Sequence, residues 1–201
     1  MKRAVWITGV PSAGKSTLGE RLVSTLRREL NEPCAFVDAD TIRKQFWPHL
    51  GLSADDRIVN VTGLAELSGV LIRAGNNVVI ACIAPDRQVR NRALGLIRVA
   101  AQEVAVHQVH VTASLDVLKT RDVKGLYRAY EDGMIKGLTG LDAPYDAPRR
   151  EEALCIDTEK VTVDEAARQV LAYIRTAPPL KIREAAHVQS PWTPDALAFP
   201  Q

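Results

Sequence analysis

A lysine and a serine end a glycine-containing segment near the N-terminus, between residues 9 and 16. The segment fits the pattern GxxxxGK followed by Ser or Thr at every fixed position. Its glycines let successive backbone N–H groups point at phosphate oxygens, and a helix that follows adds its positive end. We predict an ATP site in which Lys15 is a catalytic cation and Ser16 is a ligand of Mg²⁺. The loop residues predicted to contact ATP are Gly9, Val10, Pro11, Ser12, Ala13, Gly14, Lys15, Ser16 and Thr17.

Two carboxylates follow the second apolar run of the chain, where α/β sheets place their ligands. In the first interpretation, one of Asp38 and Asp40 binds the metal and the other accepts the proton of an attacking hydroxyl. In the second, an aspartate only caps a short helix over residues 41–47. The nearby phosphate-binding loop favours the catalytic interpretation. The spacing does not decide which carboxylate is the base.

The elements that must position these residues follow from an alternation of short apolar runs with helical periodicities. The apolar runs predict strands at residues 4–8, 34–38, 78–83, 104–111 and 153–156. The periodicities predict helices over residues 16–30, 53–74, 88–101 and 162–175, with Ser53 and Thr162 as caps and Gly75 as a stop. We therefore predict a three-layer P-loop kinase fold of the α/β class, with a mostly parallel sheet of about five strands and helices on both faces.

Two segments do not fit the alternation. Residues 121–150 are mixed in charge and rich in turn residues, and we expect them to form a mobile lid with little core of its own. Residues 177–201 are rich in proline and have no periodicity, so we expect an extended tail or a linker to another domain. The kinase domain is accordingly predicted to span residues 1–176.

The composition excludes several classes of protein. The chain has 201 residues, of which 46% are hydrophobic and 25% are charged, so a folded core is expected rather than disorder. A net charge of +2 does not indicate a nucleic-acid or membrane-surface partner. Cys34, Cys82 and Cys155 are an odd number and far apart, which fits buried thiols in a reducing cytoplasm. With four histidines and no paired cysteines, zinc is not expected.

Beyond the phosphate loop, the chain resembles the adenylylsulfate (APS) kinase family. Residues 36–43 (FVDADTIR) are similar to the family's DGDxxR segment. Residues 121–127 (RDVKGLY) and 137–145 (GLTGLDAPY) match its lid motifs in the family's order. The resemblance covers about residues 3–175 and implies transfer of the ATP γ-phosphoryl group, with Mg²⁺, to the 3′-hydroxyl of APS in sulfate activation.

The resemblance also implies roles for individual residues. It places Arg121 over the adenine of ATP and Lys124 near the phosphates. The residues implied to bind the acceptor are Asp40, Arg43, Leu52, Arg57, Asn60, Ile83, Lys124 and Leu138. The partners implied are ATP and a small nucleotide; a homodimer is left open.

Several residues on the acceptor side depart from the family's pattern. The family usually has Phe where Leu52 and Leu138 stand, and these rings sandwich the acceptor's adenine. It usually has arginines where Thr62 and Gly63 stand, and Ser-Pro-Tyr where residues 84–86 read Ala-Pro-Asp. We expect these changes to weaken the site for APS. APS is the first candidate acceptor, and a modified nucleotide such as a cytidine diphosphate derivative is the second. A non-catalytic ATP-binding module is the third interpretation.

Overall fold

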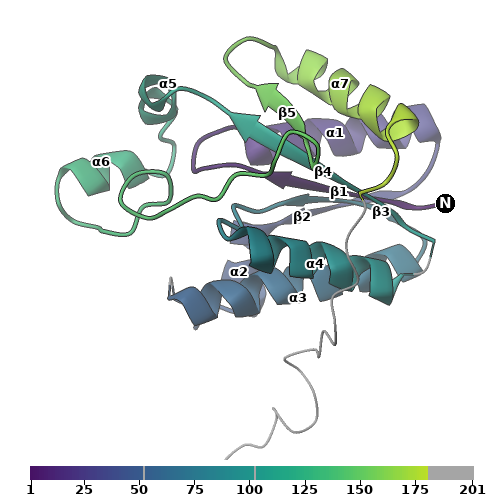
Figure 1. Cartoon of the computed structure of the whole chain (residues 1–201), viewed down its shortest axis with the longest axis horizontal. Coiled ribbons are helices and arrows are strands. Elements are labelled where there is room, and N and C mark those ends of the chain that lie inside the picture. The colour runs from purple at the N-terminus through teal and green to yellow at the C-terminus, as the bar shows by residue number, and fades with distance from the viewer. Residues whose placement is uncertain (52, 102, 181–201) are drawn as a thin grey trace, which may run out of the picture.

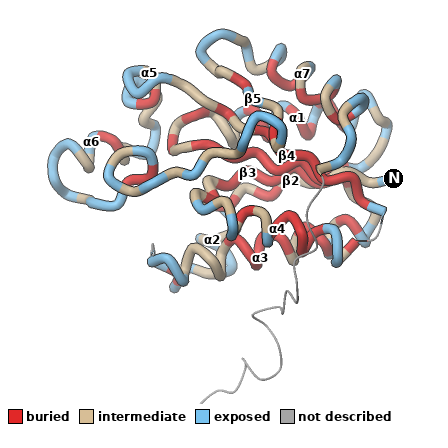
Figure 2. The backbone as a smooth tube through the Cα atoms, viewed as in Figure 1, coloured by how far each residue is buried: buried red, intermediate tan, exposed pale blue. Residues whose placement is uncertain are grey.

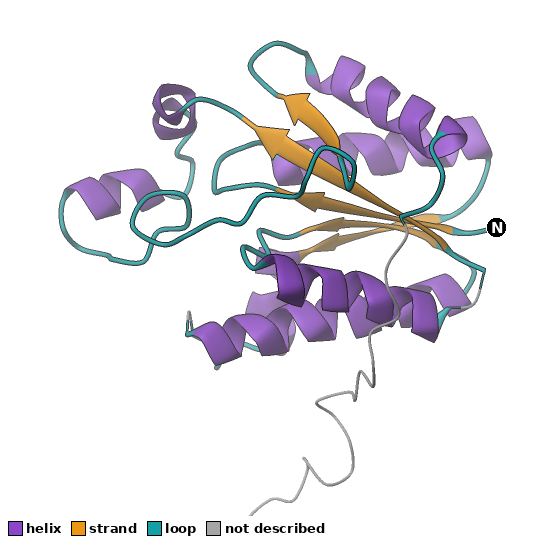
Figure 3. Cartoon of the chain, in the orientation of Figure 1, coloured by secondary structure: helices purple, strands orange, loops and turns teal. Residues whose placement is uncertain are grey.

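A parallel five-stranded sheet forms the centre of the computed structural model, which describes residues 1–51, 53–101 and 103–180 (Figures 1 and 3). Its strands are β1 (Arg3–Thr8), β2 (Cys34–Asp38), β3 (Asn77–Ala81), β4 (Ala105–Thr112) and β5 (Leu154–Asp157). They lie in the order β2-β3-β1-β4-β5, and every pairing is parallel. The expected fold class is confirmed, and each strand begins and ends within two residues of its predicted position.

Helices connect the strands. They are α1 (Lys15–Leu30), α2 (Ala39–Phe46), α3 (Ala54–Arg73), α4 (Arg87–Ala100), α5 (Leu115–Thr120), α6 (Leu126–Glu131) and α7 (Val163–Thr176). Helices α1 and α7 cover one face of the sheet, whereas α3 and α4 cover the other (Figure 1). The short helices α5 and α6 were not predicted. They lie beyond the carboxyl ends of the strands, towards which the arrowheads of Figure 3 point.

The core has two halves, one on each face of the sheet, and alternate residues of β1 serve both. Val5 and Ile7 pack with α1 and α7, and Ala4 and Trp6 pack with α3 and α4. All four side chains are fully buried, and Figure 2 shows the sheet as the most buried part of the molecule. A strand with helices over both faces reads as a continuous apolar run because both of its faces are buried.

The ends of the long helices are capped as the sequence predicts. Ser53 accepts a hydrogen bond from the backbone N–H of Asp56 at the start of α3, and Thr162 accepts one from Glu165 at the start of α7. Gly75 follows α3 with a φ of 89°, in the left-handed region that favours glycine. These caps fix where the helices begin and end relative to the sheet.

The expectation that residues 121–150 contribute little to the core is wrong for two side chains. Tyr127 and Leu138 are 2% and 6% exposed, and both belong to the core half that contains α1 and α7. Tyr127 also donates a hydrogen bond to the carbonyl of Pro11, at 3.1 Å. In this structure the predicted lid is therefore packed onto the domain.

The expectation of buried thiols holds for two of the three cysteines. Cys34 and Cys82 are buried, and burial raises their pKa values to about 11 and about 12. Cys155, on the edge strand β5, is exposed. All three thiols are free.

The predicted tail begins with a contact to the sheet. The backbone N–H of Leu180 donates to the carbonyl of Val106 at 2.9 Å, and the Leu180 side chain packs against the α3 and α4 half of the core. Residues 181–201 of the predicted tail lie outside the described residues. Among the helices that the structure describes, none is long and apolar enough to cross a membrane.

Candidate active site

The phosphate-binding loop lies between β1 and α1, the strand–loop–helix context that its motif requires. A Cβ atom at Gly9 would lie 2.4 Å from the carbonyl oxygen of Val111, so only glycine allows β4 to approach so closely. Gly14 caps α1 with a φ of 93° and offers no side-chain bond to the helix. The first N–H groups of α1 therefore remain available to an anion.

Lys15 is partly buried within this loop. Its ammonium group donates a hydrogen bond to the carbonyl of Val10 at 2.8 Å, which folds the side chain back along the loop. Burial lowers the pKa of Lys15 to about 8, and the neighbouring carboxylates of Asp40 and Asp38 oppose this shift. The lysine is thus mostly a cation at neutral pH.

Asp38 joins the loop to the end of β2. One carboxylate oxygen accepts a hydrogen bond from the Ser16 hydroxyl at 2.6 Å. The other accepts from the backbone N–H of Thr41 at 3.0 Å, so the helix-cap interpretation is confirmed for this residue. Burial raises the pKa of Asp38, but the hydrogen bonds from Ser16 and Thr41 outweigh it and leave the pKa below its usual value.

Asp40 has a different environment, in the first turn of α2 rather than at its cap. The helix begins at Ala39, two residues earlier than expected, so the two carboxylates occupy different places on the chain's exit from β2. The carboxylate of Asp40 pairs with the ammonium group of Lys124, which belongs to the predicted lid. Both side chains are about half exposed, so this pair faces solvent.

The pair formed by Ser16 and Asp38 has the chemistry of a magnesium site. Hydroxyl and carboxylate oxygens are ligands that Mg²⁺ prefers, and Mg²⁺ usually binds one or two protein oxygens together with water and substrate phosphates. Over the part of the chain that the structure describes, no group of three or more His, Cys, Asp and Glu side chains could hold a metal. The residues present therefore fit an ion that needs phosphate oxygens to complete its shell.

Thr158, which was not predicted from the sequence, connects Arg121 to the phosphate-binding loop. Its guanidinium group donates to the hydroxyl and the carbonyl of Thr158, at 2.8 and 2.9 Å. The Thr158 hydroxyl donates in turn towards the carbonyl of Ala13, at 3.2 Å. Thr158 follows β5, so its place at the carboxyl end of a parallel strand was the available signal.

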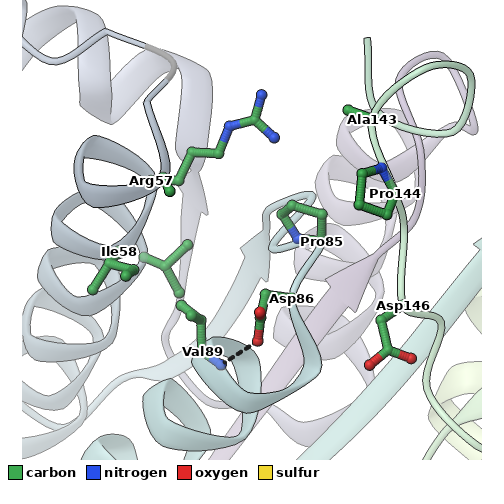
Figure 4. A pocket seen from close by; sticks show the side chains of 10 residues that line it. Arg57, Ile58, Pro85, Asp86, Val89, Ala143, Pro144 and Asp146 are labelled. Atoms are coloured by element: carbon green, nitrogen blue, oxygen red, sulfur yellow. Dashed lines mark hydrogen bonds between the residues drawn. The ribbon is translucent and has the colours of Figure 1, made fainter. Parts of the chain in front are cut away.

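A pocket of about 320 Å³ opens between the start of α3, the loop after β3 and residues 143–146 (Figure 4). Its lining residues are Ala54, Arg57, Ile58, Val61, Pro85, Asp86, Val89, Ala143, Pro144 and Asp146. Arg57 and Ile58 of α3 face Pro85, and Ala143 and Pro144 lie on the opposite side. Of the described residues predicted to bind the acceptor, Arg57 is the one that lines this pocket.

The cations and the amide predicted for the acceptor hold different partners. Arg57 donates to the Thr139 hydroxyl at 3.3 Å and thereby connects α3 to the predicted lid. Arg43 donates to the carbonyl of Leu50 at 3.0 Å. The side-chain oxygen of Asn60 is buried and has no hydrogen-bond partner among the described residues.

The remaining predicted acceptor residues are hydrophobic. The carbonyl of Ile83 accepts a hydrogen bond from Thr8 at 2.6 Å, which ties the loop after β3 to the end of β1. Leu138 is buried in the core and does not line the pocket described above. Leu52 lies outside the described residues. In this structure Leu138 is thus a core side chain.

Two departures from the family's pattern have structural explanations that the sequence did not reveal. Asp86 is the cap of α4: its carboxylate accepts from the backbone N–H of Val89 at 3.0 Å (Figure 4). Thr62 is buried, and a Cβ atom at Gly63 would lie 2.6 Å from the ring of Trp47. Both positions are therefore packed within the domain.

Comparison with known proteins places the chain in a family. The adenylylsulphate kinase family model matches residues 1–156. The chain belongs to the adenylylsulphate kinase family. An adenylyl-sulfate kinase of Gloeothece citriformis is 36% identical over 167 residues, which are 83% of this chain and 90% of that protein. One of Shewanella amazonensis is 36% identical over 171 residues, which are 85% and 83% of the two chains.

Solved structures agree with this membership. The APS kinase of Mycobacterium tuberculosis in complex with AMPPNP and APS has a TM-score of 0.79 and is 27% identical to this chain. The match covers 87% of this chain and 98% of that one. A hexameric APS kinase from Thiobacillus denitrificans, at 24% identity and a TM-score of 0.64, shows the same fold. That match covers 91% of this chain and 30% of the other.

Proposed function

We propose that this member of the adenylylsulphate kinase family transfers the γ-phosphoryl group of ATP to the 3′-hydroxyl of APS. The observation that carries the proposal is the meeting of three motifs at the carboxyl end of the sheet. Ser16 of the phosphate-binding loop donates a hydrogen bond to Asp38 at the end of β2, and Asp40, two residues further on, pairs with Lys124 of the lid motif. The related structure that holds AMPPNP and APS supports the same pair of ligands here.

In this proposal each charged residue acts on one part of the reaction. Lys15 and the N–H groups of the loop stabilise the charge that develops on the transferring phosphoryl group. Ser16 and Asp38 would hold Mg²⁺, which when bound neutralises charge on the β- and γ-phosphate oxygens. We assign the metal to Asp38 because its pKa lies below the usual value and its carboxylate is already bonded to Ser16.

Asp40 is then the base. The acceptor's 3′-oxygen forms a bond to the γ-phosphorus while the bond from that phosphorus to the β,γ-bridging oxygen breaks, and ADP leaves. The hydroxyl proton passes to the carboxylate of Asp40. Arg57, Arg43 and Asn60 are proposed to hold the anionic acceptor, and Arg121 to lie against the adenine of ATP. We further propose a cytoplasmic enzyme whose kinase domain spans residues 1–176.

A second candidate function is favoured by the pocket itself. None of its described lining residues is aromatic, and Leu138 is buried elsewhere in the core. By analogy with aromatic platforms for single-stranded bases, each missing ring removes about 1–3 kcal/mol of stacking. The second candidate function is therefore a kinase that acts on another modified nucleotide, such as a cytidine diphosphate derivative.

The test is a coupled assay of ADP release with ATP, Mg²⁺ and a panel of acceptors. APS, adenosine nucleotides and cytidine diphosphate derivatives form the panel, and Lys15→Ala is the inactive control. Turnover with APS well above that with the other compounds supports the first proposal. Turnover that is best with a pyrimidine nucleotide selects the second. No turnover with any acceptor, combined with tight ATP binding, identifies a non-catalytic module.

A further inference from the structure

The carboxylate of Asp122, in the predicted lid, accepts three backbone hydrogen bonds. One oxygen accepts from Leu126 at 2.9 Å, and the other accepts from Tyr127 and Arg128 at 2.8 and 3.1 Å. These are the first N–H groups of α6, which have no partner within the helix. The cap position is occupied by Gly125, which offers no side chain. Asp122 therefore supplies the missing cap from three residues earlier in the chain.

The segment between Asp122 and α6 is a tight turn. The N–H of Gly125 donates to the carbonyl of Asp122 at 3.0 Å, and Gly125 has a φ of 66°. The two residues inside the turn point outwards: Val123 is 96% exposed, and the side chain of Lys124 is 57% exposed. Since neither packs against the core, the shape of the turn depends on Asp122 and Gly125.

Both ends of this turn are anchored near the phosphate-binding loop. On one side Arg121 donates two hydrogen bonds to Thr158, and on the other the Tyr127 hydroxyl donates to the carbonyl of Pro11 at 3.1 Å. Between these anchors the ammonium group of Lys124 pairs with Asp40, the proposed base. The turn thus carries a single cation to the point where the proposed reaction takes place.

We propose that Asp122 is a positioning residue that holds the turn so that Lys124 stays opposite Asp40. The inference rests on the proposed function and adds to it the group that orients the lid cation. A lysine has a flexible stem, so its charge is placed accurately only if the backbone that carries it is fixed. A carboxylate is needed because its two oxygens share three N–H groups, whereas an asparagine has one accepting oxygen.

A double-mutant cycle tests whether Asp122 acts through Lys124. The variants are Asp122→Asn, Lys124→Ala and the double variant, with Asp132→Asn as the matched control at the other end of α6. We expect Asp122→Asn to lower kcat/KM for the acceptor by about 10- to 100-fold in the native background. In the Lys124→Ala background the same change should cause a loss of about twofold or less. Equal losses in both backgrounds would overturn the proposal, as would unchanged kinetics of Asp122→Asn.

A backbone variant keeps the test decisive if Asp122→Asn does not fold. Gly125→Ala strains the left-handed cap of the turn, whereas open space surrounds its new methyl group. Gly133→Ala introduces the same strain after α6, where the φ is 71° and the space is also open. We expect Gly125→Ala to reproduce the loss of Asp122→Asn and Gly133→Ala to remain within about twofold of the native chain. Equal losses in the two glycine variants would contradict a specific role for the turn.

A readout that needs no catalysis separates this proposal from the proposed function. Brief labelling of the folded chain with acetic anhydride, followed by mass spectrometry, reports how available each lysine amine is. Lys124 should be labelled faster in Asp122→Asn than in the native chain, and Asp132→Asn should leave its labelling rate unchanged. Unaltered labelling of Lys124 in Asp122→Asn overturns the positioning role. A native chain that transfers nothing to APS or any nucleotide refutes the proposed function alone.

Discussion

The Ser16 hydroxyl donates a hydrogen bond of 2.6 Å to the carboxylate of Asp38, which joins the first turn of α1 to the end of β2. The remainder of α1 separates the two segments in the sequence, and β3 lies between β1 and β2 in the sheet. The proposed pair of metal ligands therefore exists only once the parallel order β2-β3-β1 has formed. Parallel strands bring their carboxyl ends to one edge, and that edge is where this fold places its ligands.

Removal of the Lys15 ammonium group should lower turnover by several orders of magnitude without unfolding the chain. The reason is that, in the proposed function, this cation stabilises the charge on the transferring phosphoryl group. Steady-state kinetics of Lys15→Ala measure the loss, and circular dichroism checks the fold. Arg98→Ala, an exposed cation of α4, is the control and should be fully active. Near-native turnover of a folded Lys15→Ala protein would contradict the site.

Substitution of each of the two aspartates should impair turnover in a different way. Asp38→Asn weakens the proposed metal ligand, so turnover should fall and the Mg²⁺ concentration for half-maximal rate should rise at least about tenfold. Asp40→Asn removes the proposed base, so kcat should fall by about 10²- to 10⁴-fold at an unchanged Mg²⁺ requirement. Titration of Mg²⁺ with each variant distinguishes them. If Asp40→Asn is the variant that shifts the Mg²⁺ requirement, the two roles are reversed.

Nucleotide affinity should fall above about pH 8. The pKa of Lys15 is lowered to about 8 in the free chain, and bound phosphate favours the charged lysine, so binding at higher pH requires uptake of a proton. The affinity should then decrease with a limiting slope of about tenfold per pH unit. Calorimetry at pH 7.5 and 9.5 in two buffers of different ionisation enthalpy measures both affinity and proton uptake. Lys15→Arg should show neither effect if it binds, and a pH-independent native affinity would refute the linkage.

Mild acid should destabilise the chain through His107. This side chain is buried on β4 with its ring 5.5 Å from that of Tyr173, and burial, assisted by Arg3, lowers its pKa from the ordinary 6.5 to about 4. Its contribution to stability is complete above about pH 6.5 and falls as the pH decreases towards 4, because protonation favours the unfolded chain. Urea unfolding of His107→Phe should show a weaker pH dependence over this window. His49→Gln, an exposed histidine, should keep the native dependence.

A phenylalanine at position 138 should weaken the fold rather than restore a stacking face. Leu138 is 6% exposed within the core half that contains α1, so the larger phenylalanine side chain would crowd its neighbours there. We expect Leu138→Phe to lower the free energy of unfolding by about 1–3 kcal/mol. Denaturant unfolding measures it, and Val123→Phe, at a 96% exposed position of the lid, is the control. A more stable Leu138→Phe chain with a lower KM for APS would show that this side chain turns towards the acceptor.

The long helices could be predicted because the same hydrophobic pattern recurs several times along each of them. In α3, which has 20 residues, a serine caps the start, buried residues recur between Val61 and Ile72, and a glycine follows the end. The helices α5 and α6 span six residues each, which is less than two turns, so no periodicity can develop. The cap of α6 could not be predicted either, because glycine occupies the cap position and the capping carboxylate belongs to Asp122.

The residues of the candidate site likewise fall into those that the sequence predicts and those that it does not. The phosphate-binding loop is a contiguous motif whose residue types follow from phosphate chemistry, so it can be found in one stretch of sequence. Pairings such as Arg121 with Thr158, or Lys124 with Asp40, join residues 37 and 84 positions apart. Residue types alone do not specify such pairs, because the sheet order and the loop paths determine which side chains meet.

The ring of Trp47 packs against Gly63, so a substitution at either position affects the residue at the other. An arginine at position 63, the residue usual in the family, would need the space that the indole occupies. Gly63→Arg alone must displace the ring from α3, and Trp47→Ala alone would leave a cavity beside a bare glycine. Each single step therefore passes through a damaged intermediate, whereas the double replacement does not. Attempts to convert this acceptor site towards the family's usual form should vary both positions together.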